Sequence, residues 1–110
     1  MTHSIKPRIM YIERKAGELT GNAHIGRVTF NRTGTTLFYD GKTFHRSQGF
    51  KSNYVCAETG EDYWISGPKK RGGDSLYPTN ITTKIDDEVR EEYWTTIRKQ
   101  PDRIKEPETL

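Results

Sequence analysis

Three short glycine-containing turns divide the middle of this chain into brief aromatic and β-branched segments, and they restrict the fold more than any other feature. The turns are Asn31-Arg32-Thr33-Gly34, Asp40-Gly41 and Glu58-Thr59-Gly60. The Asp-Gly pair favours a type I′ turn, because both central residues of that turn need a positive φ and glycine adopts one without steric cost. Turns of this kind join neighbouring antiparallel strands. The spacing therefore predicts a series of hairpins, not strands that alternate with long helical connections.

The segments on either side of these turns have the composition of strands. We expect strands over residues 24–30, 35–39, 42–44, 53–57 and 61–66, and an opening strand around residues 8–12 that ends at Lys15-Ala16-Gly17. Side chains alternate between the two faces of a strand, so Tyr63 and Ile65 share one face and Trp64 lies on the other. Short connections between such strands predict a mainly β fold, either a small SH3-like barrel or a curved antiparallel meander of about five strands.

One helix is expected near the C-terminus, over residues 87–99. Asp86 is a residue type favoured at the N-cap, and the carboxylates that follow it suit the positive end of a helix. An apolar residue recurs at every fourth position, which predicts one stripe that packs on the sheet. The stripe consists of Val89, Tyr93 and Ile97, with Trp94 beside it. Pro101 then prevents the helix from continuing.

The length of 110 residues suits a single domain with its own core. Only 31% of the residues are hydrophobic and 30% are charged, so the six tyrosines, four phenylalanines and two tryptophans must supply much of the buried area. Residues 1–7 and 101–110 lack apolar periodicity, and we expect them to be flexible tails. The single β-rich domain is then expected to span residues 8–100 and to end in the helix.

Cys56 is the only cysteine, so a disulfide within the chain is excluded. The sequence has no apolar run long enough for a transmembrane helix and no signal-peptide pattern. These features predict a soluble cytoplasmic protein that does not bind a membrane.

The charge of +3 is distributed unevenly along the chain. Residues 1–80 contain 12 Lys and Arg against 7 Asp and Glu, a balance of +5. Residues 81–110 contain 6 against 8, a balance of −2. A basic β-rich part is consistent with a polyanionic partner, and it is equally consistent with ordinary surface solvation.

The densest group of cations follows the last predicted strand, in Pro68-Lys69-Lys70-Arg71-Gly72-Gly73. Proline and glycine keep this segment out of regular structure, and three adjacent cations on a loop can contact phosphates. The two glycines also let backbone N–H groups approach an anion closely. The loop lacks the Gly-Lys-Ser/Thr ending of a P-loop. We therefore treat Lys69, Lys70, Arg71, Gly72 and Gly73 as candidate anion-binding residues, with a loop that is simply solvated as the alternative.

Aromatic residues lie close to these cations in the sequence, and most of them are needed for the core. Trp64 is the exception to consider, because an exposed indole beside lysine and arginine can stack on a base or grip a peptide. We expect Trp64 to be the best single binding residue if its ring is exposed. Arg27, Arg32, Arg46 and Lys51 would extend the basic surface only where the strands bring them together.

No catalytic residue, metal site or cofactor is predicted. Cys56 lies in a strand with no neighbour that would lower its pKa, so it is expected to be a small core residue. Cys56, His24 and His45 do not have the spacing of metal ligands. The five carboxylates within residues 86–92 are explained by the helix dipole and a solvated helix face. They are Asp86, Asp87, Glu88, Glu91 and Glu92.

Three segments resemble, in the same order, a family of short bacterial proteins of unknown function. They are Gly26-Arg27-Val28-Thr29-Phe30, the stretch from Glu58 to Gly67, and Val89-Arg90-Glu91-Glu92-Tyr93-Trp94. Some members carry the label 1-deoxy-D-xylulose-5-phosphate synthase. The Gly-Asp-Gly motif that begins a thiamine-diphosphate site is missing here, and Gly72-Gly73-Asp74 does not replace it. The resemblance therefore implies a bacterial origin and a fold, without a reaction.

Together these features predict a non-catalytic binding protein. Nucleic acid or another polyanion is the first expected partner, because of the basic β-rich part and its loop. The alternative is a protein–protein adaptor or regulatory module that uses an aromatic groove.

Overall fold

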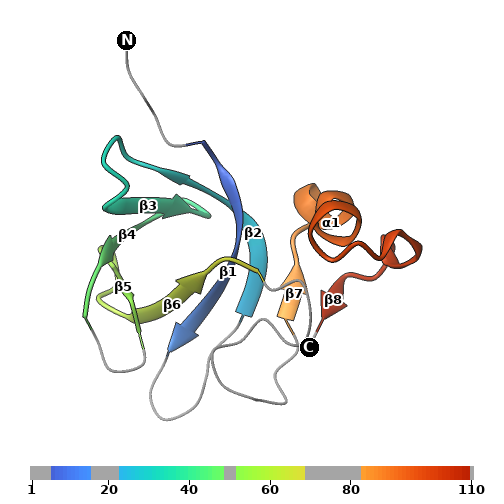
Figure 1. Ribbon diagram of the computed structural model, residues 1–110. Coiled ribbons are helices and arrows are strands. Elements are labelled where there is room, and N and C mark those ends of the chain that lie inside the picture. Colours follow the sequence, from blue (N-terminus) through green and yellow to red (C-terminus); the bar gives the residue numbers. More distant parts are fainter. Residues whose placement is uncertain (1–5, 16–22, 49–51, 69–82, 110) are drawn as a thin grey trace.

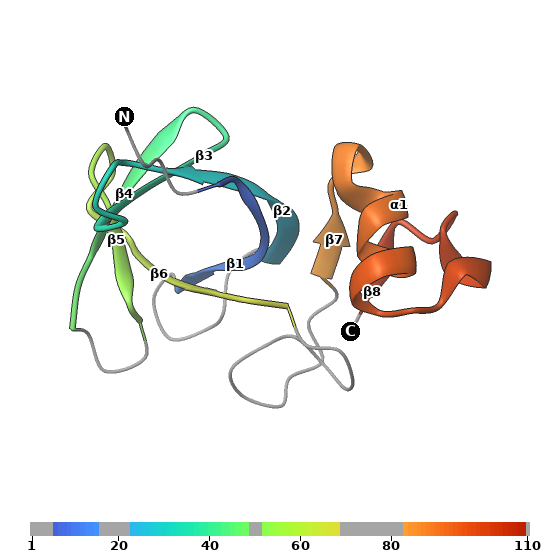
Figure 2. The same ribbon diagram turned by 45° about the horizontal axis from the view of Figure 1, so that its top comes forward.

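A computed structural model describes residues 6–15, 23–48, 52–68 and 83–109 of the chain. Six strands form a closed antiparallel barrel in the order β1-β6-β5-β4-β3-β2, and pairing between β1 and β2 closes the ring (Figures 1 and 2). Their bounds are β1 Arg8–Lys15, β2 Ala23–Phe30, β3 Thr36–Tyr39, β4 Lys42–Arg46, β5 Tyr54–Cys56 and β6 Asp62–Ser66. The predicted fold class, a small SH3-like β barrel with one C-terminal helix, is confirmed.

The turns between the strands have the backbone geometry that the sequence predicts. Asp40 and Gly41 have φ angles of 52° and 73°, as a type I′ turn requires. Gly34 and Gly60 also have positive φ, at 79° and 77°. Local turn chemistry therefore sets the β2–β3, β3–β4 and β5–β6 connections.

Strand β1 separates two hydrophobic cores and is buried on both faces. Met10 and Ile12 face the barrel interior, where they pack with residues such as Phe44, Tyr63 and Ile65. Ile9 and Tyr11 face outward and belong to a second core beneath the C-terminal helix. The alternation expected for β6 is confirmed, since Trp64 packs against this second core while its neighbours point into the barrel.

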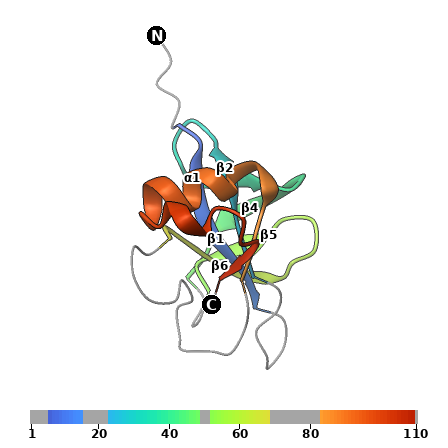
Figure 3. The ribbon, with the colours of Figure 1, turned by 90° about the vertical axis from the view of Figure 1, so that its right-hand side faces the viewer.

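The C-terminal helix spans residues 87–97 and covers the outer side of β1 and β2 (Figure 3). It comprises a 3₁₀ turn (η1, Asp87–Val89), an α turn (α1, Arg90–Glu92) and a π turn (η2, Tyr93–Ile97). The predicted stripe is correct, because Val89, Tyr93 and Trp94 are fully buried in the second core and Ile97 packs against it. The helix ends earlier than the predicted residue 99, where Lys99 adopts a positive φ of 56°.

The helix start differs from the expectation in one respect. Asp86 precedes the first turn but its side chain makes no capping hydrogen bond. The carboxylate instead accepts a hydrogen bond from the hydroxyl of Tyr39 in β3, 47 residues earlier. A tertiary partner therefore replaces the local capping role that the sequence suggests.

Two short strands extend the barrel sheet beside β2, and neither is anticipated by sequence patterns. Strand β7 (Thr83–Ile85) runs parallel to β2, and β8 (Glu108–Thr109) pairs with β7. The lack of apolar periodicity predicts a flexible tail over residues 101–110. In the structure residues 101–103 form a 3₁₀ turn (η3, Pro101–Arg103), and the Ile85 N–H donates a 2.7 Å hydrogen bond to the Pro107 carbonyl. Strands of two or three residues carry too little periodicity to be recognised.

Trp94 is the residue that holds this last segment on the helix. Its indole is fully buried, and its Nε1–H donates a 2.9 Å hydrogen bond to the Glu106 carbonyl. The Arg103 guanidinium lies 4.3 Å from the centroid of the indole, in cation–π geometry. Trp94 thus adds a buried attachment point to the pairing of β8 with β7.

Candidate functional site

The structure describes only one of the residues predicted for the binding site, Trp64. Lys69, Lys70, Arg71, Gly72 and Gly73 lie outside the described residues. Trp64 is half-buried, and its Nε1–H donates a 3.1 Å hydrogen bond to the Ser66 hydroxyl. An indole that packs on the second core and has its N–H bonded offers little free surface for stacking, so Trp64 is a poor candidate for a binding residue.

The strands bring together only some of the other predicted cations. Arg27 does not join them, because its guanidinium contacts two carboxylates of the C-terminal helix, Glu92 Oε1 at 2.8 Å and Glu88 Oε1 at 3.1 Å. These hydrogen bonds, first that of Glu92 and then that of Glu88, raise the pKa of Arg27 above its ordinary value. Arg27 therefore connects β2 to the helix. Lys51 lies outside the described residues.

Arg32 and Arg46 do meet at one end of the barrel. Connections in an up-and-down antiparallel barrel alternate between its two ends, so the start of β1, the β2–β3 turn and the end of β4 share one end. The Arg46 N–H also donates a 3.3 Å hydrogen bond to the Thr35 carbonyl in the β2–β3 turn. We call the four exposed cations here the basic end: Lys6, Arg8, Arg32 and Arg46.

The carboxylates of the barrel are distributed unevenly between its two ends. The acidic residues of the described barrel segments all lie toward the opposite end, and they are Glu13, Asp40, Glu58, Glu61 and Asp62. Among the described residues of the barrel itself, the basic end therefore contains no carboxylate. The Arg46 guanidinium lies 5.8 Å from the centroid of the Tyr54 ring, which holds this cation over the rim of the barrel.

The end of β6 lies beside the basic end. A Cβ atom added to Gly67 would lie 3.8 Å from Nη2 of Arg8. Gly67, at the end of β6, thus lies near Arg8, and the predicted basic loop follows it in the sequence. The sequence signal that could have identified this surface is the placement of arginine at alternate strand ends, which is informative only once the barrel topology is known.

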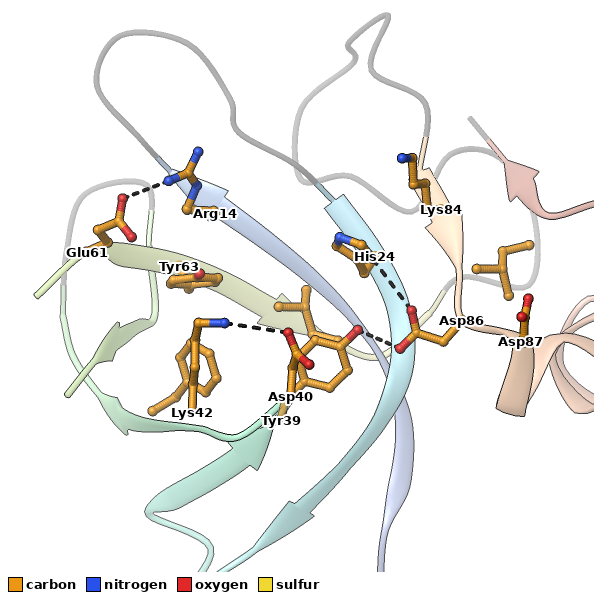
Figure 4. Close-up of a pocket in the computed structure, with 13 residues that line it drawn as sticks. Arg14, His24, Tyr39, Asp40, Lys42, Glu61, Tyr63, Lys84, Asp86 and Asp87 are labelled. Atoms are coloured by element: carbon orange, nitrogen blue, oxygen red, sulfur yellow. Dashed lines mark hydrogen bonds and ion pairs between the residues drawn. The ribbon is translucent and has the colours of Figure 1, made fainter. Parts of the chain in front are cut away.

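The opposite end of the barrel opens into a cavity of about 740 Å³. We call this cavity the charged mouth. Ion pairs surround it (Figure 4): Arg14 Nη1 lies 2.9 Å from Glu61 Oε2, Lys42 Nζ lies 3.5 Å from Asp40 Oδ2, and His24 Nδ1 lies 3.5 Å from Asp86 Oδ1. Lys84 of β7 projects toward the same space, and Ile12, Phe44 and Tyr63 contribute apolar surface.

Asp86 is the central acceptor of the charged mouth. The Tyr39 hydroxyl donates a 2.6 Å hydrogen bond to Oδ2 of Asp86. Burial, followed by this hydrogen bond, raises the pKa of Tyr39 well above its ordinary value. Nδ1 of His24 is buried and makes no hydrogen bond, although Oδ1 of Asp86 lies 3.5 Å away. Sequence reasoning missed this site, since its residues come from strands far apart in the chain.

The residues weighed for catalysis or metal binding are dispersed. Cys56 is buried in the barrel core, whereas His45 is exposed on the outside of β4, where Nδ1 lies 3.2 Å from the Thr36 hydroxyl. His24 is at the charged mouth. Within the described ranges, no group of three His, Cys, Asp or Glu side chains is arranged to hold a metal ion.

The acidic cluster of the helix is engaged with arginine side chains. Glu88 and Glu92 contact Arg27, and Asp87 pairs with Arg90 in the first turns of the helix. These contacts agree with a structural role for the carboxylates. Part of the negative charge of residues 81–110 therefore neutralises Arg27 of β2 and Arg90 of the helix itself.

No family model, curated protein or solved structure matches this chain. The resemblance to a family of short bacterial proteins stays a prediction. None of the helices in the part of the chain that the structure describes has the length and apolar character needed to cross a membrane.

Proposed function

We propose that this protein binds nucleic acid, or a polyanion of similar charge density, without catalysing a reaction. The observation that carries the proposal is the cluster of four exposed cations at one end of the barrel. The carboxylates of the described barrel residues lie toward the other end, where they are accompanied by cations of their own. A concentrated positive rim attracts phosphates and releases condensed counterions when they bind. The same rim borders the point where the chain enters the predicted loop Lys69–Gly73.

The geometry supports phosphate contacts more than base stacking. Trp64 is half-buried, and Tyr54 is buried beneath Arg46. Arginine side chains on a rim contact the backbone of a nucleic acid, and such contacts carry no direct sequence information. We therefore expect binding that depends strongly on salt and weakly on sequence.

The test is a titration of the labelled protein with single-stranded RNA, single-stranded DNA, duplex DNA and inorganic polyphosphate at two salt concentrations, followed by backbone amide shifts. Binding should weaken steeply at the higher salt concentration, and the shifts should include residues 6–8, 31–35 and 46–48. The polyphosphate titration distinguishes a general polyanion site from one that requires a nucleic acid.

Matched variants locate the contact. Arg32→Glu with Arg46→Glu should abolish most of the binding, whereas Arg27→Ala should change it little, because Arg27 is already paired with the helix carboxylates. A separate Lys69→Ala, Lys70→Ala and Arg71→Ala variant tests the predicted loop. The proposal would be refuted if no amide shifts appeared at the lower salt concentration. Binding that did not weaken at the higher concentration, or shifts confined to the charged mouth, would also refute it.

A further inference from the structure

The charged mouth is a second site, at the opposite end of the barrel from the basic end. Its cavity of about 740 Å³ lies within the range of roughly 300–1,000 Å³ that is usual for ligand sites. Residues from β1, β2, β6, β7 and the β3–β4 turn converge on it (Figure 4). A polyanion would not suit this cavity, because carboxylates alternate with the cations around it.

The charges of the mouth favour a ligand that carries both signs. Arg14 is paired with Glu61, Lys42 with Asp40, and His24 faces Asp86. A ligand with one sign would meet a like charge beside each favourable one. Surface ion pairs are weak, about 0–1 kcal/mol, so their members can exchange partners with charged groups on a ligand at small cost.

Several polar groups at the mouth make no hydrogen bond to the described residues. Nδ1 of His24 is buried without a hydrogen bond, and the Tyr63 hydroxyl and the Lys84 ammonium group make no hydrogen bond or ion pair there. A buried polar atom without a hydrogen bond is uncommon, so Nδ1 of His24 is a group that a ligand could engage. Beside these groups, the edge-to-face pair of Phe44 and Tyr63, with centroids 4.7 Å apart, provides apolar contact.

From this arrangement we propose that the charged mouth binds a peptide segment that bears side chains of both charges. A peptide supplies opposite charges for the ion pairs, amide groups for His24 and Tyr63, and apolar atoms for the ring of Tyr63. The cavity is larger than a single free amino acid requires. The proposal goes beyond polyanion binding, because it concerns a different surface and a different ligand chemistry.

Three blocked hexapeptides of equal length serve as probes: one alternates lysine and glutamate, one alternates lysine and serine, and one alternates glutamate and serine. Each is titrated into the labelled protein while backbone amide shifts are followed. The mixed-charge peptide should bind at least about five-fold more tightly than either single-sign peptide, which corresponds to about 1 kcal/mol. Its shifts should map to Arg14, His24, Lys42 and Lys84.

Charge removal then tests both signs separately. Lys84→Met and Asp40→Asn affect exposed side chains, and asparagine tolerates the positive φ at residue 40. Each variant should weaken the mixed-charge peptide about three-fold or more and leave the fold unchanged in the amide spectrum. Arg32→Glu with Arg46→Glu is the control at the other end, and it should not alter peptide binding.

Equal binding of all three peptides, shifts that map away from the mouth, or no shift at millimolar peptide would overturn the proposal. These outcomes are independent of the nucleic-acid titration, because that experiment reports on the basic end. Loss of polyanion binding in Arg32→Glu with Arg46→Glu, with peptide binding retained, would separate the two sites in one protein.

Discussion

The Tyr39 hydroxyl and the Asp86 carboxylate form a 2.6 Å hydrogen bond directly over the backbone of Gly26. The bond connects β3 of the barrel to the junction between β7 and the C-terminal helix, and it also closes one side of the charged mouth. A Cβ atom on Gly26 would lie 2.5 Å from Oδ2 of Asp86 and 2.9 Å from the Tyr39 hydroxyl. The small residue in β2 is therefore what permits this contact.

Removal of the Tyr39 hydroxyl tests the contribution of the bond. Tyr39→Phe should lower the free energy of unfolding by about 1 kcal/mol, because a hydrogen bond to a charged acceptor is lost while Asp86 stays partly solvated. Chemical denaturation measures the change. Tyr63→Phe is the matched control and should be nearly neutral, since the Tyr63 hydroxyl makes no hydrogen bond within the described residues. Equal effects of the two substitutions would contradict this role for Tyr39.

The raised pKa of Tyr39 predicts a loss of stability at alkaline pH. The unfolded chain releases the tyrosine proton near its ordinary pKa of about 10, whereas the folded protein retains it, so the free energy of unfolding falls as the pH rises above that value. The stabilisation is fully present below this pH. The difference in stability between the wild-type protein and Tyr39→Phe should therefore shrink as the pH increases, as measured by denaturation at several pH values. A constant difference would show that the pKa of Tyr39 is not raised.

Gly26→Ala should destabilise the protein by about 1–3 kcal/mol, the usual cost of an added methyl group in a site without space. The substitution should also separate Tyr39 from Asp86, which amide and side-chain NMR shifts at both residues would report. Gly67→Ala is the control, because among the described residues a Cβ there would meet Arg8 alone, at 3.8 Å, an ordinary contact distance. A well-tolerated Gly26→Ala would contradict the close approach.

Trp94→Phe should release the C-terminal segment from the helix. The substitution removes the hydrogen bond to the Glu106 carbonyl and leaves a cavity, and we expect a loss of about 2–3 kcal/mol. Hydrogen exchange at the Ile85 amide should accelerate, because its acceptor is the Pro107 carbonyl next to Glu106. Trp64→Phe should have a smaller effect, since that indole is only half-buried. Unchanged exchange at Ile85 would mean that β8 is held by other contacts.

Sequence patterns predicted the local parts of this fold well. The turns at Asp40-Gly41 and Glu58-Thr59-Gly60 have the positive φ angles expected of them, and the alternation in β6 places Tyr63 in the barrel. The apolar stripe of the helix is also where its spacing predicts. Each of these features depends on interactions within a few residues, which is why a single sequence contains enough information.

Local sequence patterns predict the residues of the candidate sites less well. Arg32 and Arg46 lie together, as a shared basic surface requires, but Arg27 is paired with Glu88 and Glu92 of the helix. Trp64 was a conditional candidate, and its position on the second core counts against it. Asp86 was assigned to a helix cap, although its partner is 47 residues away. The partner of a surface charge depends on which strands become neighbours.

Backbone preference and hydrophobic periodicity act locally, so the amino-acid sequence predicts where the chain turns, which residues alternate into the barrel and which stripe of the helix is buried. The tertiary structure alone shows that β1 is buried on both faces and that β7 joins β2 in parallel. It also places the carboxylates of the described barrel residues toward one end and four exposed cations at the other. These outcomes follow from closure of the ring, which brings strand ends together regardless of their separation along the chain.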